Sequence, residues 1–162
     1  MLPNSWEDNE TLQFYTDSAG SLGWAIIFGK KWVAAPWPQH MSVCKRNNAF
    51  LELFPIVVAM MIWGHKLTNS KVIFNCDNMA VVNMISQQTS RDPDCMTLIR
   101  KMVLICLRHN ILFKSKHISG SKNLLADSLS RLQIQKFKTL CPDAEESKTA
   151  IPLAAWSLLV KK

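Results

Sequence analysis

The sequence has no run of the roughly 18 consecutive apolar residues that a membrane-spanning helix requires. Its longest candidate, Leu53 to Gly64, is 12 residues long, and we expect it to be a buried helix. The N-terminus lacks the basic and then apolar pattern of a signal peptide. Internal repeats and low-complexity segments are missing as well. We therefore expect a soluble, intracellular protein, and the sequence does not distinguish cytoplasm from nucleus.

Cysteine is sparse and follows no recognisable pattern. The chain has five cysteines, with no Cys-x-x-Cys pair and no cluster of cysteine and histidine. This spacing indicates neither a disulfide framework nor a zinc site. We expect reduced, mostly buried thiols at Cys44, Cys76, Cys95, Cys106 and Cys141.

Charge is distributed unevenly along the chain. Residues 1–90 contain six Lys/Arg and six acidic residues, so the net charge of +7 arises entirely from residues 91–162. A basic half of this kind favours a polyanionic partner, although many basic proteins bind no nucleic acid.

Apolar patterning predicts one α/β domain. Strands are expected at 12–16, 23–28, 32–35, 71–76 and 111–116, and helices at 49–67, 77–85, 96–109 and 123–132. The order is βββαβααβα, in which the first three strands form an antiparallel meander and the helix-linked strands run parallel. We therefore expect a mixed five-stranded sheet with helices packed on it. Residues 1–10 would be a leader, 11–132 the domain, and 133–162 a C-terminal tail or linker.

Three aspartates occupy positions that ordinary structural roles explain. Asp17 follows an apolar strand and would suit a turn, and Asp77 follows the central strand and would suit a helix N-cap. Asp127 lies in the last helix, where a solvated face would explain it. Each of these residues, considered alone, favours the structural role.

Glu52 is not explained in the same way. It lies in a helical segment, 49–63, in which almost every other residue is apolar. Burying a lone carboxylate is costly unless it is paired, protonated or bound to a cation. Since no basic residue lies within one helical turn of Glu52, a functional role is favoured.

The four carboxylates are expected to meet in space. The first meander strand and the first parallel strand commonly lie side by side, so Asp17 and Asp77 would leave neighbouring strand ends. The first helix could bring Glu52 to that edge, and the last helix could bring Asp127. Converging carboxylates repel one another and raise their pKa values, a problem that two Mg²⁺ ions would remove. Two such ions about 4 Å apart suit in-line attack of water on a phosphodiester.

His117 is a fifth candidate. It ends the fifth strand ten positions before Asp127, next to a loop containing Gly120. A histidine there could shuttle a proton or assist product release, and an ordinary loop histidine is equally compatible. We assign no role to His40, His65 or His109.

Together these motifs resemble those of the ribonuclease H family, and they occur in the same order along the chain as in that family. They are Thr16-Asp-Ser-Ala-Gly, Leu51-Glu-Leu, Cys76-Asp-Asn-Met-Ala and the segment from His117 to Arg131. The last segment is similar to the closing motif of retrotransposon ribonucleases H. A narrower similarity, to the DIRS/Ngaro class of tyrosine-recombinase elements, rests on Gly29-Lys-Lys-Trp, Ala-Pro-Trp-Pro38, Ile62-Trp-Gly-His-Lys-Leu67 and Phe137 to Asp143. The resemblance covers roughly residues 11–145.

The resemblance implies a ribonuclease H-like fold and a two-metal endoribonuclease. It implies that Mg²⁺, or Mn²⁺, supports cleavage of the RNA strand of RNA–DNA hybrids, leaving a 3′-hydroxyl and a 5′-phosphate. The enzyme would recognise the 2′-hydroxyls of the RNA strand and the phosphates of both strands, and not the base sequence. The metal-binding catalytic residues would be Asp17, Glu52, Asp77 and Asp127, with His117 as the auxiliary histidine. Substrate-binding positions would be Ser18, Gly20, Asn78 and Asn123.

The chain also departs from the family in two respects. It lacks the separate Lys/Arg-rich handle of cellular enzymes, since that region contains only Arg91, Arg100, Lys101 and Arg108. It also lacks the Tyr-x-Asp-Asp polymerase motif, so a reverse transcriptase domain would be a partner in a parent polyprotein.

Three alternatives remain open. The first is a catalytically inactive nucleic-acid-binding remnant of a retroelement polyprotein. The second is another enzyme of the same superfold, such as a transposase, an integrase core or an exonuclease. The third is a structural or interaction protein, which would leave Glu52 unexplained.

Overall fold

The first three strands form an antiparallel meander. The structure is a computed structural model that describes residues 2, 5–6, 12, 14–39 and 47–160. Strand β1 (Phe14–Ala19) pairs with β2 (Gly23–Phe28), which pairs with β3 (Lys31–Pro36). Short turns link these strands, and Gly29 adopts a φ of 61°, a conformation that glycine accepts without steric cost. The expected meander is confirmed.

The remaining two strands are parallel. Strand β4 (Lys71–Cys76) pairs with β5 (Leu112–His117). Parallel neighbours need a long crossover, which helices α3 (Met79–Gln87) and α4 (Pro93–Arg108) supply. Asp92 caps α4 by accepting from the backbone N–H of Asp94 at 2.8 Å, as the Asp92-Pro93 sequence predicts.

The two groups of strands meet along β1 and β4. The rings of Phe14 and Phe74 contact edge to face, 5.7 Å between centroids, and both belong to the main hydrophobic core. Backbone pairing among the described strands joins β1-β2-β3 and, separately, β4-β5. The α/β class and all strand directions agree with expectation. The difference is that apolar side chains, not a backbone ladder, connect β1 to β4.

Helix α2 (Asn48–Trp63) is the central element of the main core. Its N-cap is Asn47, whose side chain accepts from the backbone N–H of Phe50 at 2.7 Å. A 3₁₀ turn, Gly64–Leu67, continues it. Residues 48–67 are long and apolar enough to cross a membrane, but 72% of their most apolar window is buried inside the protein. This burial is expected of the core helix of a globular domain.

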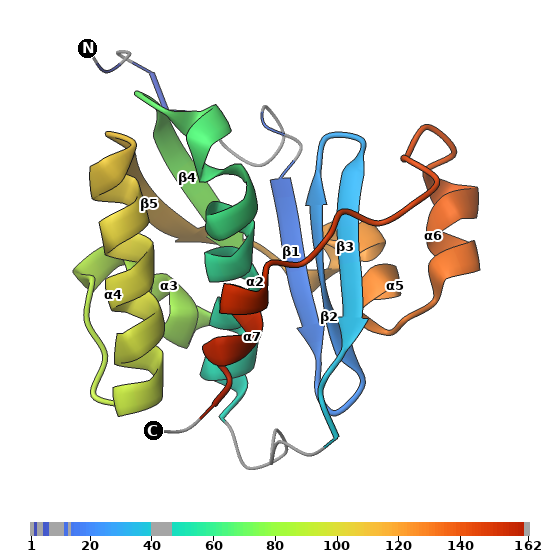
Figure 1. The fold of residues 1–162 in the computed structure, drawn as a ribbon, viewed down its shortest axis with the longest axis horizontal. Coiled ribbons are helices and arrows are strands. Elements are labelled where there is room, and N and C mark those ends of the chain that lie inside the picture. Colours follow the sequence, from blue (N-terminus) through green and yellow to red (C-terminus); the bar gives the residue numbers. More distant parts are fainter. Residues whose placement is uncertain (1, 3–4, 7–11, 13, 40–46, 161–162) are drawn as a thin grey trace.

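The three-stranded sheet is covered on both faces (Figure 1). Helix α2 and the short C-terminal α7 (Leu153–Ser157) contribute to the main core on one face. On the other face, α5 (Leu124–Ser130) and α6 (Ile134–Leu140) form a second core against β2 and β3. Coverage on both faces explains why β2 is almost continuously apolar.

Residues 133–160, expected as a tail, are instead packed against the domain. Phe137 of α6 has no exposed surface and contacts the ring of Trp32 at 5.6 Å between centroids. Ala155 of α7 is also fully buried, and Leu159 is 3% exposed. The sequence gives little sign of this packing. Each of these short helices buries only one or two residues, so neither shows a clear apolar periodicity. The expected leader lies mostly outside the described residues.

Two boundaries differ from expectation near the candidate residues. Strand β1 runs through Asp17 to Ala19, so Asp17 lies within the strand and pairs with Ala25. Helix α3 begins at Met79, and its N-cap is Asn78 instead of Asp77. Both changes remove the ordinary structural explanation for the two aspartates. Of the cysteines, Cys76, Cys95 and Cys106 are free and buried, as expected, Cys141 is half-buried, and Cys44 lies outside the described residues.

The packing of α6 generates a stability prediction. Phe137→Ala should lower the free energy of unfolding by about 3–5 kcal/mol, because it empties a filled site in the second core. Leu140→Ala, on the same helix at a side chain that is 52% exposed, should change it by less than about 0.5 kcal/mol. Urea unfolding measures both. Equal effects would mean that α6 is not part of the domain core.

Candidate metal centre

Asp17 is buried in the middle of the protein despite its charge. Its side chain is only 6% exposed, and strand β1 directs it away from solvent. The hydroxyl of Ser130, at the end of α5, lies 2.9 Å from the Oδ2 atom of Asp17 and can donate to it. This contact ties β1 to α5 beside the carboxylate.

Glu52 reaches the same place from α2. The helix packs against β1, and the hydroxyl and backbone N–H of Ser18 lie near the Glu52 carboxylate and lower its pKa, against the larger effect of burial. The sequence expectation that Glu52 faces the strand ends is therefore confirmed. Ser18, an expected substrate-binding residue, lies near the Glu52 carboxylate in this structure.

Asp77 completes the group from the end of β4. Because Asn78 caps α3, accepting from the backbone N–H of Val81 at 3.2 Å, Asp77 is not engaged in capping. Its side chain is exposed. Ligand oxygens of Asp17, Glu52 and Asp77 all lie within 4.8 Å of one another. Three carboxylates from three different elements thus converge at one point.

Electrostatics at this point disfavour the ionised forms. Burial, opposed by the Ser130 hydrogen bond and increased by the charges of Asp77 and Asp127, raises the pKa of Asp17 to about 6. Burial, together with the charges of Asp17 and Asp77, raises the pKa of Glu52 to about 8. Across the described residues, no ion pair joins these three carboxylates to a Lys, Arg or His. A bound divalent cation would supply the missing positive charge.

The donors suit a hard cation. Carboxylate oxygens are the preferred ligands of Mg²⁺ and Mn²⁺. The nearest soft donor is Cys76, the residue before Asp77, and burial raises the pKa of its thiol to about 12. Without metal the thiol is therefore protonated at neutral pH, and the three carboxylates are the donors that converge. The site therefore fits an oxygen-binding divalent ion better than zinc.

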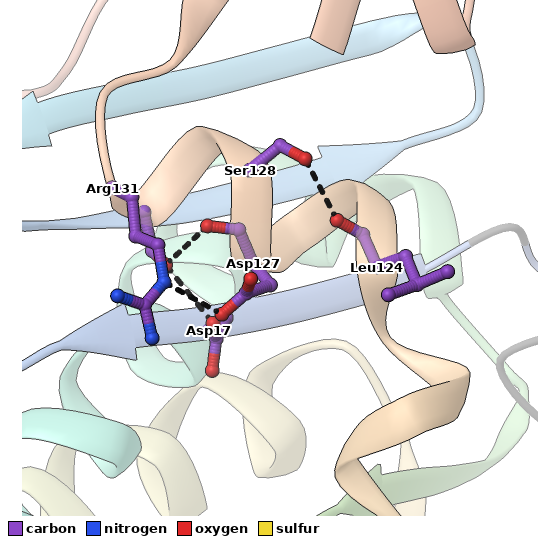
Figure 2. Close-up of polar contacts among 6 residues, drawn as sticks. Asp17, Leu124, Asp127, Ser128 and Arg131 are labelled. Atoms are coloured by element: carbon purple, nitrogen blue, oxygen red, sulfur yellow. Dashed lines mark hydrogen bonds and ion pairs between the residues drawn. The ribbon is translucent and has the colours of Figure 1, made fainter. Parts of the chain in front are cut away.

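Asp127 lies beside the cluster but outside it. Its Oδ1 atom is 3.2 Å from Nε of Arg131, one turn later on the chain, and its side chain is 43% exposed. Figure 2 shows this ion pair next to Asp17. Asp127 is close enough to contribute to the raised pKa of Asp17. The structure thus brings three of the four expected carboxylates together and places the fourth at the margin, because Arg131 competes for it.

The loop between β5 and α5 passes over the cluster. His117 is exposed and pairs in register with Cys76, next to Asp77. A Cβ added at Gly120 would lie 3.3 Å from the Oδ2 atom of Asp77. Gly120 therefore gives the loop a close approach to the carboxylate, and His117 stands at the start of that loop.

The expected substrate-binding residues have mixed positions. Gly20 lies in the exposed β1–β2 turn with a φ of 34°. Asn123 is 7% exposed, and its Nδ2 atom donates to the backbone oxygen of Thr16 at 2.8 Å. Its Oδ1 atom is buried without a partner among the described residues. Asn123 thus fixes the loop to β1, one residue before Asp17.

Sequence reasoning assigned no role to Ser130. Ser130 is fully buried. Among the described residues, it is the one whose side chain donates a hydrogen bond to the Asp17 carboxylate. The sequence does contain a sign of this role. Ser130 lies three residues after Asp127, which places both side chains on the same side of a helix.

Solved ribonucleases H share this arrangement of strands and helices. Ribonuclease H1 from the halophilic archaeon Halobacterium salinarum NRC-1 matches with a TM-score of 0.51 and 15% identity, covering 75% of this chain and 95% of that one. LC11-RNase H1 in complex with an RNA/DNA hybrid matches with a TM-score of 0.55 and 18% identity, covering 76% and 94%. The chain has a ribonuclease H-like fold.

A further structure supports the same assignment of the ribonuclease H-like fold. LC11-RNase H1 isolated from compost by a metagenomic approach matches with a TM-score of 0.51 and 21% identity, covering 76% of this chain and 94% of that one. No protein-family model matches the sequence, and the comparison with curated proteins finds no match. At these identities the likeness is one of fold.

The raised pKa values predict how stability depends on pH without metal. Between pH 4.5 and about 8 the folded state keeps Glu52 protonated while the unfolded chain ionises it, so the folded state binds more protons. Stability should therefore fall as pH rises through this range, with Asp17 adding to the fall up to about pH 6. In Glu52→Gln, stability should decline less steeply above pH 6, and the melting temperature at pH 8 should be higher than that of the wild type. Glu146→Gln, at an exposed position, should leave the profile unchanged.

Metal should reverse that decline. Mg²⁺ or Mn²⁺ binds the ionised carboxylates of the folded state, so either ion should raise the melting temperature more at pH 8 than at pH 6. The increase should disappear in Asp77→Asn and persist in Asp143→Asn, since Asp143 is an exposed residue outside the cluster. A scan of thermal unfolding against metal concentration checks this. An equal increase in both variants would exclude the cluster as the binding site.

Proposed function

We propose that this protein is a ribonuclease H, a divalent-metal-dependent endonuclease that cleaves the RNA strand of RNA–DNA hybrids. The observation that carries the proposal is the convergence of Asp17, Glu52 and Asp77 within 4.8 Å. The ribonuclease H-like fold supports it, because one protein of that fold was solved with an RNA/DNA hybrid. The basic C-terminal half, residues 91–162, supports a polyanionic substrate.

Each carboxylate would have a distinct part in holding the metal. Asp17 is held in place, since its side chain is buried and Ser130 contacts it. Glu52 projects from a helix that is almost entirely buried in the main core. Asp77 is exposed, so a substrate could reach it. A bound Mg²⁺ or Mn²⁺ pair would supply Lewis-acid activation of water and charge stabilisation at the leaving oxygen.

Asp127 would be the fourth ligand in the proposed site. Its ion pair with Arg131 is exposed, and such pairs contribute little to stability, so exchanging it for a metal ligand is inexpensive. Arg131 would then be free to contact a phosphate. His117, exposed at the start of the loop over Asp77, would move protons near the scissile phosphate or assist release of product.

We further propose a retroelement origin. The sequence motifs that resemble DIRS/Ngaro ribonucleases H, including the segment from His117 to Arg131, support this context. The domain would then act beside a reverse transcriptase domain. That domain would supply the affinity for the hybrid that the Lys/Arg-rich handle supplies in cellular enzymes. Ser18, Gly20, Asn78 and Asn123 remain proposed substrate contacts.

A specific observation favours one alternative. Because Arg131 already neutralises Asp127, a chain that never exchanges this pair would bind hybrid without cutting it. This would be an inactive nucleic-acid-binding remnant. The two functions differ in whether labelled RNA is shortened.

The assay uses a hybrid with labelled RNA, with Mg²⁺ or Mn²⁺. The purified chain should cut the RNA, leave 5′-phosphate ends, and spare double-stranded DNA. Asp77→Asn should lower the rate at least about 100-fold, because removing a group that stabilises transition-state charge has effects of this size. Asp143→Asn is the matched control and should cut normally. Binding of hybrid without cutting, by a folded wild-type protein, would favour the remnant.

A further inference from the structure

A cavity lies beside the β1–β2 turn, apart from the carboxylate cluster. Its volume is about 650 Å³, which is within the range of small-molecule sites. Three segments form its walls: the turn, the residues after β3, and the C-terminal segment that crosses the sheet into α7 (Figure 1). Its lining includes Leu22 from the turn, Trp37 after β3, and Lys148 and Trp156 from the C-terminal segment.

One wall of the cavity is aromatic. Trp37 and Trp156 both line it, and each packs on Trp24, with ring centroids 6.3 and 5.9 Å apart. Trp156 is only partly buried, so part of its ring remains accessible. Flat, rigid tryptophan faces are suited to stacking against a planar ring.

Two indole N–H groups, one in this wall and one behind it, have no acceptor among the described residues. The indole N–H groups of Trp24, fully buried, and Trp37, 5% exposed, have no partner among the described residues. Buried polar groups in folded proteins are nearly always hydrogen-bonded. Both N–H groups are covered by protein, so the wall offers a ligand the apolar surface of its rings and no accessible donor.

The charge of the lining selects against cations. Lys148 is the one charged residue among those that line the cavity, and no acidic residue does. Lys148 is exposed, and no described carboxylate forms an ion pair with it. An anionic group on the ligand would find Lys148 at the rim.

We propose that this cavity binds a nucleotide. The base would stack on the tryptophan wall, and the phosphate would meet Lys148. Base stacking on tryptophan is independent of base identity, so the site discriminates little among bases.

The β1–β2 turn connects the cavity to the strand that carries Asp17. The turn closes with the backbone N–H of Leu22 donating to the oxygen of Ala19 at 2.7 Å, and Asp17 lies two residues before Ala19 on β1. The nucleotide therefore has two possible sources. One is a free nucleoside monophosphate; the other, which rests on the proposed function, is an unpaired nucleotide at the end of a substrate strand.

The test follows the six tryptophan indole signals of the ¹⁵N-labelled protein by NMR, in EDTA. Adenosine 5′-monophosphate, titrated to about 10 mM to reach weak affinities, should shift the Trp37 and Trp156 signals in a saturable manner. The signals of Trp32 and Trp63, in other parts of the fold, should stay in place. Replacement of each tryptophan by phenylalanine assigns the signals.

Paired variants separate the cavity from the rest of the surface. Leu22→Glu, at a side chain 48% exposed, and Lys148→Ala should each weaken binding about tenfold, by repelling or no longer attracting the phosphate. Their controls, Leu140→Glu at 52% exposure and Lys136→Ala, lie on α6 and should bind as wild type does. Absence of shifts at any concentration, or equal weakening in variants and controls, would overturn the proposal. If Leu22→Glu fails to fold, Lys148→Ala and its control decide.

Hybrids identify the source. An RNA–DNA hybrid with one unpaired terminal nucleotide should bind about tenfold tighter than its blunt counterpart if the strand end occupies the cavity, and Leu22→Glu should remove that difference. Binding of adenosine 5′-monophosphate without any advantage for the overhang assigns the cavity to free nucleotide. Because the monophosphate titration needs no cleavage, it decides the cavity even if the protein proves inactive on hybrids.

Discussion

Mutual repulsion among Asp17, Glu52 and Asp77 is the constraint on which the rest of the structure depends. Their oxygens lie within 4.8 Å of one another, and two of the three groups have pKa values raised to about 6 and about 8. Such a cluster destabilises the folded chain near neutral pH unless a cation is bound. The scaffold must therefore be rigid enough to keep the groups together against this force.

The fold supplies that rigidity from three directions. Strand β1 is covered by α2 on one face and joined to α5 through Ser130 on the other. Helix α2 is held almost entirely within the main core, so Glu52 cannot swing toward solvent without disturbing it. Asn123 fixes the β5–α5 loop to β1, and Gly120 lets that loop approach Asp77. The elements that carry Asp17 and Glu52 are thus held by packing in the core as well as by contacts of the Asp17 carboxylate itself.

Much of this arrangement could be predicted from the sequence. The strands and long helices follow apolar periodicity, and Glu52 stands out because it is the one charged residue in an apolar helix. Local signals also favour an N-cap at Asn47 or Asn48 and a helix start at Asp92-Pro93, and the structure has caps at Asn47 and Asp92. The convergence of Asp17, Glu52 and Asp77 could be predicted from two facts alone: which strands are neighbours, and that the first helix crosses their ends.

Other features depended on side-chain geometry that no local pattern encodes. The pairing of Asp127 with Arg131 and the contact of Ser130 with Asp17 are set by the rotation of α5. The choice of Asn78 over Asp77 as cap shifts a helix start by a single residue. The packing of residues 133–160 depends on a few buried side chains, such as Phe137, in short helices with weak periodicity. The seam between β1 and β4 depends on how two aromatic rings meet.

The central claim is that the three carboxylates form a cation site whose charge state is coupled to metal binding. Calorimetric titration of Mn²⁺ at pH 7, in buffers of different ionisation enthalpy, measures both the affinity and the protons released. Because the pKa of Glu52 is about 8, binding should release close to one proton for each site filled, and Glu52→Gln should release almost none. Binding without proton release by the wild type, or unchanged release in Glu52→Gln, would contradict the account.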